Sequence, residues 1–344
     1  AHMKPSIIGI DLAKNVFAIH GLDEAGGAVL KRTLRRGQVL GFFGKLEPCL
    51  IGMEACSGAH YWGRELGRMG HRVRLMPAAY VKAYVKRGKT DAADAEAICE
   101  ALTRPTLRFV PVKSVAQQGF LSVHRVRDVL VRQRTQTVNV LRSLIAEFGV
   151  AAAKGKMALG ELAVLVGNEN DARLPDEARL ALRPLVAQWE QLSRAIAALE
   201  REIVTRARAD ERSQRLETIP GVGPITAGAM IATLGDPKRF SRARDLAAWI
   251  GLTPRARCSG GKERLGSISK QGDPYLRRLL VQGAAAVIRT ARSPRSKASA
   301  WLKELLARRP AKVAIVALAN KMARIVWAVL TKGGTYRRSE TVAA

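Results

Sequence analysis

The stretch Ser6-Ile7-Ile8-Gly9-Ile10-Asp11-Leu12-Ala13 decides how the first part of the chain folds. Its isoleucines predict a buried β-strand, and Asp11 places a single carboxylate at the end of that strand. A carboxylate in this position costs folding free energy unless a positive group pairs with it. A divalent metal ion is the natural partner, so we expect Asp11 to be one of several acids at a metal site.

The segments after this strand follow an order typical of one fold. Apolar runs, turn residues and helical spacing predict strands at residues 7–11, 16–22, 28–34, 49–54 and 72–76, and helices at 37–47 and 57–69. Three meandering strands, helix, strand, helix and strand is the order of an RNase H-like fold. In that fold the first and fourth strands lie side by side, which would bring Asp11 next to Glu54.

A predicted helix that starts near Thr90 carries two further acids. Asp91 and Asp94 are three residues apart and therefore share a helix face. They could simply be N-terminal acids that the helix dipole favours, with Thr90 or Asp91 as the cap. Together with Asp11 and Glu54, however, they supply the bridging and flanking carboxylates that two Mg²⁺ ions need to hold a phosphodiester for in-line displacement.

The charge of the chain indicates its partner. The 344 residues include 58 Lys and Arg against 29 Asp and Glu, a formal net charge of +29. A phosphate polymer best compensates so much like-charge repulsion, so we expect a nucleic-acid partner. A GC-rich genome would explain arginine over lysine but not the surplus over acids. A membrane is the weak alternative, because no uninterrupted apolar run is long enough to span a bilayer.

The cysteines favour a reducing compartment. Cys49, Cys56, Cys99 and Cys258 form no C-x-x-C pair and lie far apart in the sequence. Neither a zinc site nor a disulfide framework is indicated. We expect Cys49 and Cys99 to be core residues and the protein to be cytoplasmic.

Two basic segments are candidates for contact with RNA or DNA. The first follows Tyr80 and interleaves Tyr84 with its charges, and the second is a predicted helix at residues 117–148. Solvated surface is the alternative for both. The basic residues singled out are Lys86, Arg87 and Lys89 in the first segment, and Arg125, Arg127, Arg132 and Arg134 in the second.

Residues 151–210 change to Ala, Leu, Glu and Arg, with an apolar residue every three or four positions from Leu185 to Ile203. This predicts a helical hairpin with an apolar seam, either a coiled coil between subunits or a pair within the chain. Pro175 and Pro184 are expected to mark its irregular start.

A turn sequence follows at Ile219-Pro220-Gly221-Val222-Gly223-Pro224. A Pro-Gly-x-Gly turn between two helices is the helix-hairpin-helix pattern. Gly221 and Gly223 would let backbone N–H groups and a helix N-terminus approach a DNA phosphate. A tight turn without a ligand is the alternative.

A serine lies between basic residues farther on. Ser259 precedes a glycine pair, and flexible backbone there would let its hydroxyl approach a phosphodiester. The residues leave open a nucleophilic serine, a loop that only holds phosphate, and Cys258 as a rival nucleophile. The cations that could hold the phosphate are Arg255, Arg257, Lys262, Arg264 and Lys270.

Two sets of motifs resemble the DEDD transposases of the IS110 family, which are relatives of the Piv/MooV DNA invertases. The resemblance covers nearly the whole chain in the right order. The first set is Ile8-Gly9-Ile10-Asp11, Met53-Glu54 and Lys89-Thr90-Asp91-Ala92-Ala93-Asp94-Ala95. The second is Ile219 to Pro224, Gly251-Leu252-Thr253-Pro254, Ser259-Gly260-Gly261 and Ser269-Lys270-Gln271-Gly272-Asp273.

The resemblance implies a division into domains. A RuvC-like (RNase H-like) α/β catalytic domain with a basic C-terminal helix would span residues 4–150, and a coiled-coil helical hairpin 151–212. A mostly α transposase domain with the helix-hairpin-helix and the serine would span 213–335, before a tail at 336–344.

The resemblance also implies a mechanism. The acidic tetrad matches Asp11, Glu54, Asp91 and Asp94, and the C-terminal serine of the family matches Ser259. Members often carry a second serine where this chain has Cys258. A bridge RNA guides members to donor and target DNA, and dimers pair into tetramers whose sites combine acids of one subunit with the serine of another. The resemblance thus implies an RNA-guided, Mg²⁺-dependent DNA recombinase of a bacterial cytoplasm, associated with the nucleoid when active.

Two other functions stay open at this point. A RuvC-like junction resolvase would cut DNA with metal-activated water and no serine. A nucleic-acid-binding architectural protein would keep the fold without catalysis, which the presence of all four acids disfavours.

Overall fold

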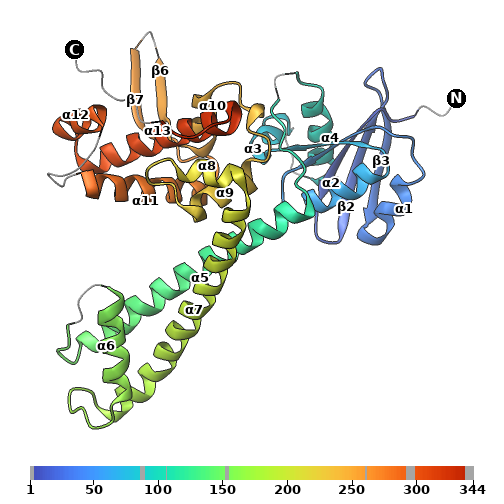
Figure 1. Cartoon of the computed structure of the whole chain (residues 1–344). Helices are drawn as coiled ribbons and strands as arrows, with labels where there is room; N and C mark the ends of the chain where they lie inside the picture. The colour runs from blue at the N-terminus through green and yellow to red at the C-terminus, as the bar shows by residue number, and fades with distance from the viewer. Residues whose placement is uncertain are drawn as a thin grey trace, which may run out of the picture. The chain divides into compact units, whose positions relative to one another are not determined.

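The computed structural model describes residues 4–85, 90–105, 107–151, 155–259, 262–291 and 299–337. The chain forms two compact units, Ala1–Gln118 and Gly119–Ala344. The first is built on a β-sheet and the second mainly from helices (Figure 1). The predicted α/β first part and mostly helical remainder are therefore confirmed at the level of fold class.

The first unit contains one five-stranded sheet in the order β3-β2-β1-β4-β5. β1 runs antiparallel to β2 and parallel to β4, which in turn is parallel to β5. The predicted neighbouring of the first and fourth strands is confirmed, and the order is compatible with an RNase H-like domain. The strands are β1 (Ile7–Leu12), β2 (Val16–Leu22), β3 (Ala28–Arg35), β4 (Leu50–Glu54) and β5 (Arg72–Met76).

Helices cover both faces of this sheet. On one face, Ile8, Ile10 and Met53 form a core with α1 (Val39–Phe43) and α2 (Ala59–Arg68). On the other, Ile7 and Leu50 pack with α3 (Ala78–Val81), η2 (Lys82–Tyr84) and α4 (Asp91–Leu102). Successive side chains of a strand point to opposite faces, so the sequence IIGIDL supplies apolar groups to both layers.

The helix predicted at residues 37–47 is shorter than expected. A 3-10 turn, η1 (Arg36–Gln38), precedes α1, which ends at Phe43. Gly37, Gly41 and Gly44 explain the difference, because each glycine lowers helix stability by about 1 kcal/mol relative to alanine.

Three helices form the first part of the second unit. α5 (Val115–Ala146), α6 (Lys156–Gly167) and α7 (Asp176–Ala209) share a core that includes Leu141, Leu162 and Leu182. Thr137 of α5 donates a hydrogen bond to Gln188 of α7 (3.2 Å). The apolar seam of α7 therefore packs within the chain, against α5 and α6 as well as α9.

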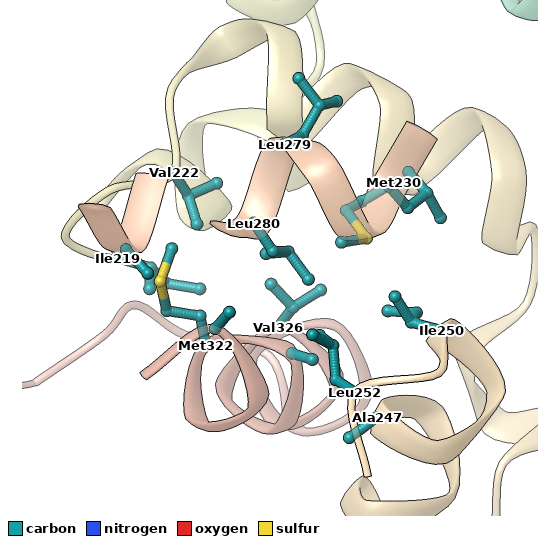
Figure 2. Close-up of a cluster of buried hydrophobic side chains, with 14 of the residues drawn as sticks. Ile219, Val222, Met230, Ala247, Ile250, Leu252, Leu279, Leu280, Met322 and Val326 are labelled. Atoms are coloured by element: carbon teal, nitrogen blue, oxygen red, sulfur yellow. The ribbon is translucent and has the colours of Figure 1, made fainter. Parts of the chain in front are cut away.

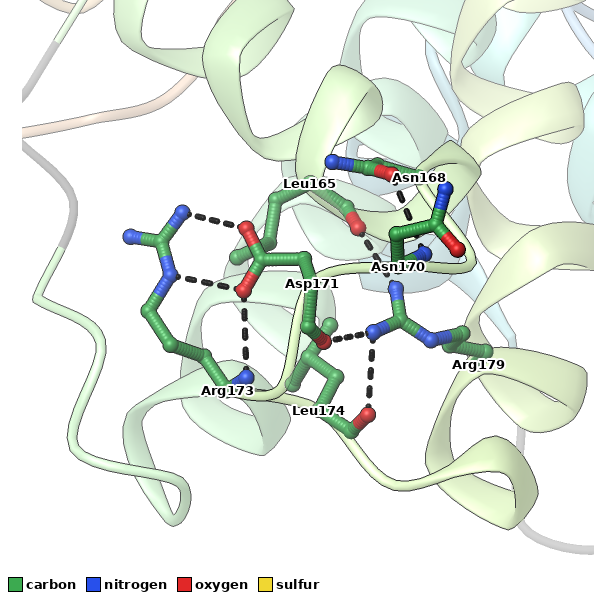
Figure 3. Close-up of polar contacts among 7 residues, drawn as sticks. All are labelled: Leu165, Asn168, Asn170, Asp171, Arg173, Leu174 and Arg179. Carbon is green, nitrogen blue, oxygen red and sulfur yellow. Dashed lines mark hydrogen bonds and ion pairs between the residues drawn. The ribbon is translucent and has the colours of Figure 1, made fainter.

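Pro184 lies inside α7 rather than at an irregular start, which corrects the prediction. Pro175 lies at the N-cap position of α7, at the start of the helix as predicted. Pro184 is exposed, and an interior proline disfavours a helix; the apolar contacts of Leu182 and Leu185 on either side of it hold the helix in place. The loop before α7 is held by Arg179, whose side chain is buried and donates to the carbonyls of Leu165 and Leu174 (Figure 3).

The rest of the second unit surrounds the largest apolar cluster. Met230, Leu280 and Val326 come from three different helices and meet in it (Figure 2). The elements here are α8 (Glu211–Glu217), α9 (Pro224–Leu234), η3 (Pro237–Arg239), α10 (Ala243–Ile250), α11 (Pro274–Ala291), α12 (Ala300–Arg308) and α13 (Ala311–Lys332).

α13 is long and apolar enough, by length and composition, to cross a membrane. Its buried residues, among them Leu318, Met322 and Val326, pack instead against α10 and α11. One side of the helix therefore belongs to the apolar core of the second unit.

A two-stranded hairpin stands where the sequence indicated only flexible backbone. β6 (Pro254–Ser259) pairs antiparallel with β7 (Lys262–Ile268), and Ser259 is opposite Lys262. Neither strand shows the alternation of apolar and polar residues that predicts a half-buried strand, so the hairpin was not predictable from the sequence.

Candidate functional site

Asp11 and Glu54 occupy equivalent positions on neighbouring parallel strands. The register of β1 and β4 pairs Ile10 with Met53, and each acid is the next residue of its strand. Ile10 and Met53 are buried on the face of α1 and α2, so the two acids belong to the opposite face. Both are half-buried. The sheet therefore brings these two predicted ligands together.

Two glycines allow α4 to lie on that same face. A Cβ atom at Gly9 would be 2.3 Å from the carbonyl oxygen of Ala95, and one at Gly52 would be 2.5 Å from Cδ1 of Leu102. A side chain at Gly9 would push the backbone of the helix away, and one at Gly52 would displace the side chain of Leu102. Because Gly9 and Gly52 precede Asp11 and Glu54 by two residues, they share a face with the acids.

The other two predicted ligands lie in the first turn of α4. Thr90 is the N-cap, and its Oγ1 accepts a hydrogen bond from the backbone N–H of Ala93 (3.2 Å). Asp91 is exposed and Asp94 is half-buried. The helix dipole stabilises carboxylates at this end of a helix, so both acids are also favourable here without a metal ion.

The pKa of the Cys56 thiol depends on the first acid pair, Asp11 and Glu54. Burial raises the pKa of Cys56, and the negative charges of Glu54 and Asp11 raise it further. Both carboxylates are thus close enough to act electrostatically on one thiol. Cys49, Cys56 and Cys99 are free thiols, and Cys49 and Cys99 are buried as predicted.

The oxygen donors of the four acids suit Mg²⁺, which prefers carboxylates and water. In the described residues, however, no three Asp, Glu, His or Cys side chains are gathered closely enough to hold a metal ion. The structure gives one pair of acids at the strand ends and another pair on the covering helix.

Ser259 lies at the end of β6, and its side chain is outside the described residues, as are those of Arg257 and Lys262. The base of its hairpin is closely packed. A Cβ at Gly251 would be 2.0 Å from the carbonyl oxygen of Gln271, and one at Gly272 would be 1.8 Å from that of Trp249. Both glycines have positive φ, 80° and 81°. These contacts hold the segments before β6 and after β7 against each other.

Arg277 was not identified from the sequence, yet it joins both segments at the hairpin base. Its Nη1 donates to the carbonyl oxygens of Ile250 (2.8 Å) and Gln271 (3.1 Å). Arg255, predicted to contact phosphate, donates to the carbonyl of Ser269 (2.9 Å). Arg264 and Lys270 are exposed, and Lys270 has a positive φ of 55°. An arginine on a helix carries no sequence signal that distinguishes such a role.

The two glycines of the turn before α9 differ in their surroundings. A Cβ at Gly221 (φ 85°) would be 2.7 Å from the carbonyl oxygen of Gly283, whereas one at Gly223 would have nothing within 4 Å. Gly221 is therefore required by packing between α11 and the turn. Gly223 precedes Pro224 at the open N-terminus of α9.

The predicted basic residues of α5 fall into two groups. Arg127 pairs with Glu200 (2.6 Å), and Arg132 lies 3.6 Å from Asp128, so both charges are partly compensated within the chain. Arg125 is exposed and Arg134 is half-buried. Lys86, Arg87 and Lys89 lie outside the described residues.

Comparisons with known proteins show the family of the chain. A model described as a transposase of the DEDD, IS110 type matches residues 8–149, and one described as the transposase IS116/IS110/IS902 family matches residues 213–300. A protein of Pseudomonas aeruginosa named "Probable family 20 transposase" is 50% identical over 97% of this chain and 99% of its own length.

The chain belongs to the IS110 family of transposases. The transposase for insertion sequence element IS1111A of Coxiella burnetii is 42% identical, over 96% of this chain and 91% of its own. The transposase for element IS1328 of Yersinia enterocolitica is 39% identical, over 97% and 99%. This IS110-family protein is therefore a DNA transposase, an enzyme that acts on DNA.

Proposed function

We propose that this transposase is an RNA-guided recombinase that uses Ser259 as nucleophile and a RuvC-like Mg²⁺ site formed by Asp11, Glu54, Asp91 and Asp94. The observation that carries the proposal is the register of β1 and β4, which gives Asp11 and Glu54 equivalent positions on one sheet face. α4 packs on that face and carries the other two acids.

The proposed reaction exchanges phosphodiester bonds without net hydrolysis. The Ser259 Oγ attacks a DNA phosphorus atom, the bond from phosphorus to one deoxyribose oxygen breaks, and the released hydroxyl takes up a proton. A hydroxyl of the partner duplex then attacks the phosphoserine, and serine is released with its proton. The same steps on the second strand resolve a Holliday-type junction. Because each broken bond is replaced by another, no ATP is required.

The acids of the first unit would bind Mg²⁺, which when bound offsets negative charge on the phosphate undergoing displacement. The hairpin would present Ser259, and its base, held by Gly251, Gly272 and Arg277, would keep β6 in place. In the proposal the acids of one subunit act with the serine of another, in a tetramer of two dimers.

A structured bridge RNA would select the donor and target DNA by base pairing. The net charge of +29 supports binding to the phosphate backbones of both RNA and DNA. The exposed Arg125 of α5 is a candidate contact. The open N-terminus of α9 at Gly223 is a candidate contact for the DNA backbone.

A suicide DNA substrate, analysed on denaturing gels, tests the nucleophile. The wild-type protein should form a covalent protein–DNA adduct, and Ser259→Ala should form none. Ser267→Ala is the matched control, since Ser267 lies exposed on the other strand of the same hairpin. Cys258→Ala should keep the adduct.

Three results would contradict this assignment. An adduct with Ser259→Ala would exclude the serine, and its loss in Cys258→Ala would favour the thiol. Cut DNA without any adduct in the wild-type protein would favour a resolvase that uses water.

A further inference from the structure

We infer that the part of the sheet that α4 leaves uncovered binds the phosphate backbone of the DNA strand to be cut. This inference rests on the proposed function, because it places DNA beside Asp11. It is carried by strand register, by the extent of α4 and by the charges of β3.

The register places three residues in one row across the sheet. Asp11 of β1 pairs with Ala18 of β2, and Ala18 pairs with Thr33 of β3. Laterally paired residues point to the same face, so Thr33 shares the face of Asp11. Two strand spacings separate them, roughly 10 Å.

α4 covers only part of this face. It packs on β1, β2 and β4, and Ala18 and His20 of β2 are buried beneath it. Beyond them the surface opens: Val16 of β2 is 42% exposed, and Lys31, Thr33 and Arg35 of β3 are exposed. The open strip therefore lies on the same sheet face as Asp11, and the buried Ala18 separates the two within the row.

The strip is positively charged. Lys31 and Arg35 flank Thr33 on the same face of β3. Within the described residues, neither cation has an acidic partner among the ion pairs of the structure. They lie four residues apart, about 13 Å along the strand, a distance that corresponds to about four nucleotides of B-form rise. Lysine, arginine and threonine are all common phosphate contacts.

On the opposite face of the same segment, two arginines stack on aromatic rings. Arg32 stacks over the ring of Phe42 (5.4 Å) and Arg36 over the ring of Trp62 (5.1 Å). Those aromatic residues belong to α1 and α2, on the face away from Asp11. The segment thus carries two pairs of cations with the same spacing, one on each side of the sheet.

The test compares Lys31→Gln/Arg35→Gln with the matched double variant Arg32→Gln/Arg36→Gln. Binding of the full chain to a fluorescein-labelled DNA duplex of random sequence is followed by anisotropy at several salt concentrations, in EDTA. Cleavage does not contribute in EDTA, so the result is independent of the adduct assay on gels.

Two lost phosphate contacts should reduce the slope of log affinity against log salt by about 1.8 for the Lys31/Arg35 variant. Between about 50 and 200 mM salt, the wild-type protein should then lose about ten-fold more affinity than this variant. Lys31→Gln alone should reduce the slope by about 0.9. The Arg32/Arg36 variant should keep the wild-type slope.

Equal slopes for the two double variants, whether both unchanged or both reduced, would overturn the inference. The same binding measurement is made with a labelled structured RNA hairpin in place of the DNA. If the Lys31/Arg35 variant weakens binding to this RNA but not to DNA, the strip binds RNA and the assignment to DNA is wrong.

Discussion

Gly9 of β1 lies directly beneath Ala95 of α4, and a Cβ at Gly9 would come within 2.3 Å of the carbonyl oxygen of Ala95. Cys99, one turn farther along the helix, donates from its Sγ to the carbonyl of His20 (3.1 Å). The close approach of strand and helix is thus backed by a second contact on β2. It keeps α4 on the sheet face to which Asp11 belongs.

Gly9→Ala should destabilise the first unit. The new methyl group would meet backbone, which cannot move aside, and overpacking of this kind costs about 1–3 kcal/mol. Urea unfolding measures the loss. Gly41→Ala is the control, because a Cβ at Gly41 meets nothing within 4 Å; it should be neutral or stabilising. Equal effects of the two substitutions would show that α4 is free to shift.

Arg179 should be required for the α6–α7 end of the second unit. It is 2% exposed and donates to the carbonyls of Leu165, Asp171 and Leu174 (Figure 3). Arg179→Met would remove the charged donor from all three carbonyls, and hydrogen bonds from charged groups contribute about 1.5–3 kcal/mol each. Thermal unfolding should show a lower midpoint.

Arg183→Met provides the comparison for Arg179. Arg183 is exposed and pairs with Glu169 (2.6 Å), and a surface ion pair contributes only about 0–1 kcal/mol. If Arg183→Met lowered the unfolding midpoint as much as Arg179→Met, the stabilising role assigned to Arg179 would be contradicted.

His124 should make stability fall in acid. It is fully buried beside Tyr275, and burial, followed by the charge of Arg127, lowers its pKa from 6.5 to about 4. The unfolded chain therefore takes up a proton below pH 6.5 while the folded protein stays neutral. Stability contributed above pH 6.5 should be lost as the pH falls towards 4, by about 3 kcal/mol.

Urea unfolding of wild type and His124→Gln between these pH values measures the effect, since other groups titrate equally in both proteins. The difference in free energy of unfolding between them should change with pH. A constant difference would show that His124 is protonated as easily in the folded protein as in the unfolded chain.

Arg277→Met should slow the chemistry attributed to the serine hairpin. Loss of its hydrogen bonds to Ile250 and Gln271 would loosen the base from which β6 extends. We expect slower formation of the covalent adduct at unchanged DNA affinity, because Arg277 is not placed on DNA. Arg289→Met, on the exposed last turn of α11, should leave the rate unchanged. Reduced affinity with a normal rate would instead make Arg277 a DNA contact.

The sequence predicted the parts of the site that depend on strand order. Runs of apolar residues located β1 and β4, and the order of elements then predicted that Asp11 and Glu54 would be neighbours. The hairpin of Ser259 was not predictable in this way, because its strands are polar and its stability depends on distant contacts such as that of Gly272 with Trp249. Arg277 was missed for the same reason, since its partners are backbone carbonyls that only the fold brings together.

Asp11 and Glu54 should both be required for DNA cleavage. Asp11→Asn keeps the size and polarity of the side chain but removes its charge, and a neutral amide is a weaker Mg²⁺ ligand than a carboxylate. Strand cleavage should fall by at least about 100-fold, while binding of DNA in EDTA stays at the wild-type level. Glu54→Gln should do the same, since both acids belong to one sheet face. Glu65→Gln, on α2 on the other side of the sheet, is the control and should cleave normally. Normal cleavage by Asp11→Asn would remove the basis for the metal site, even if Ser259 proved to be the nucleophile.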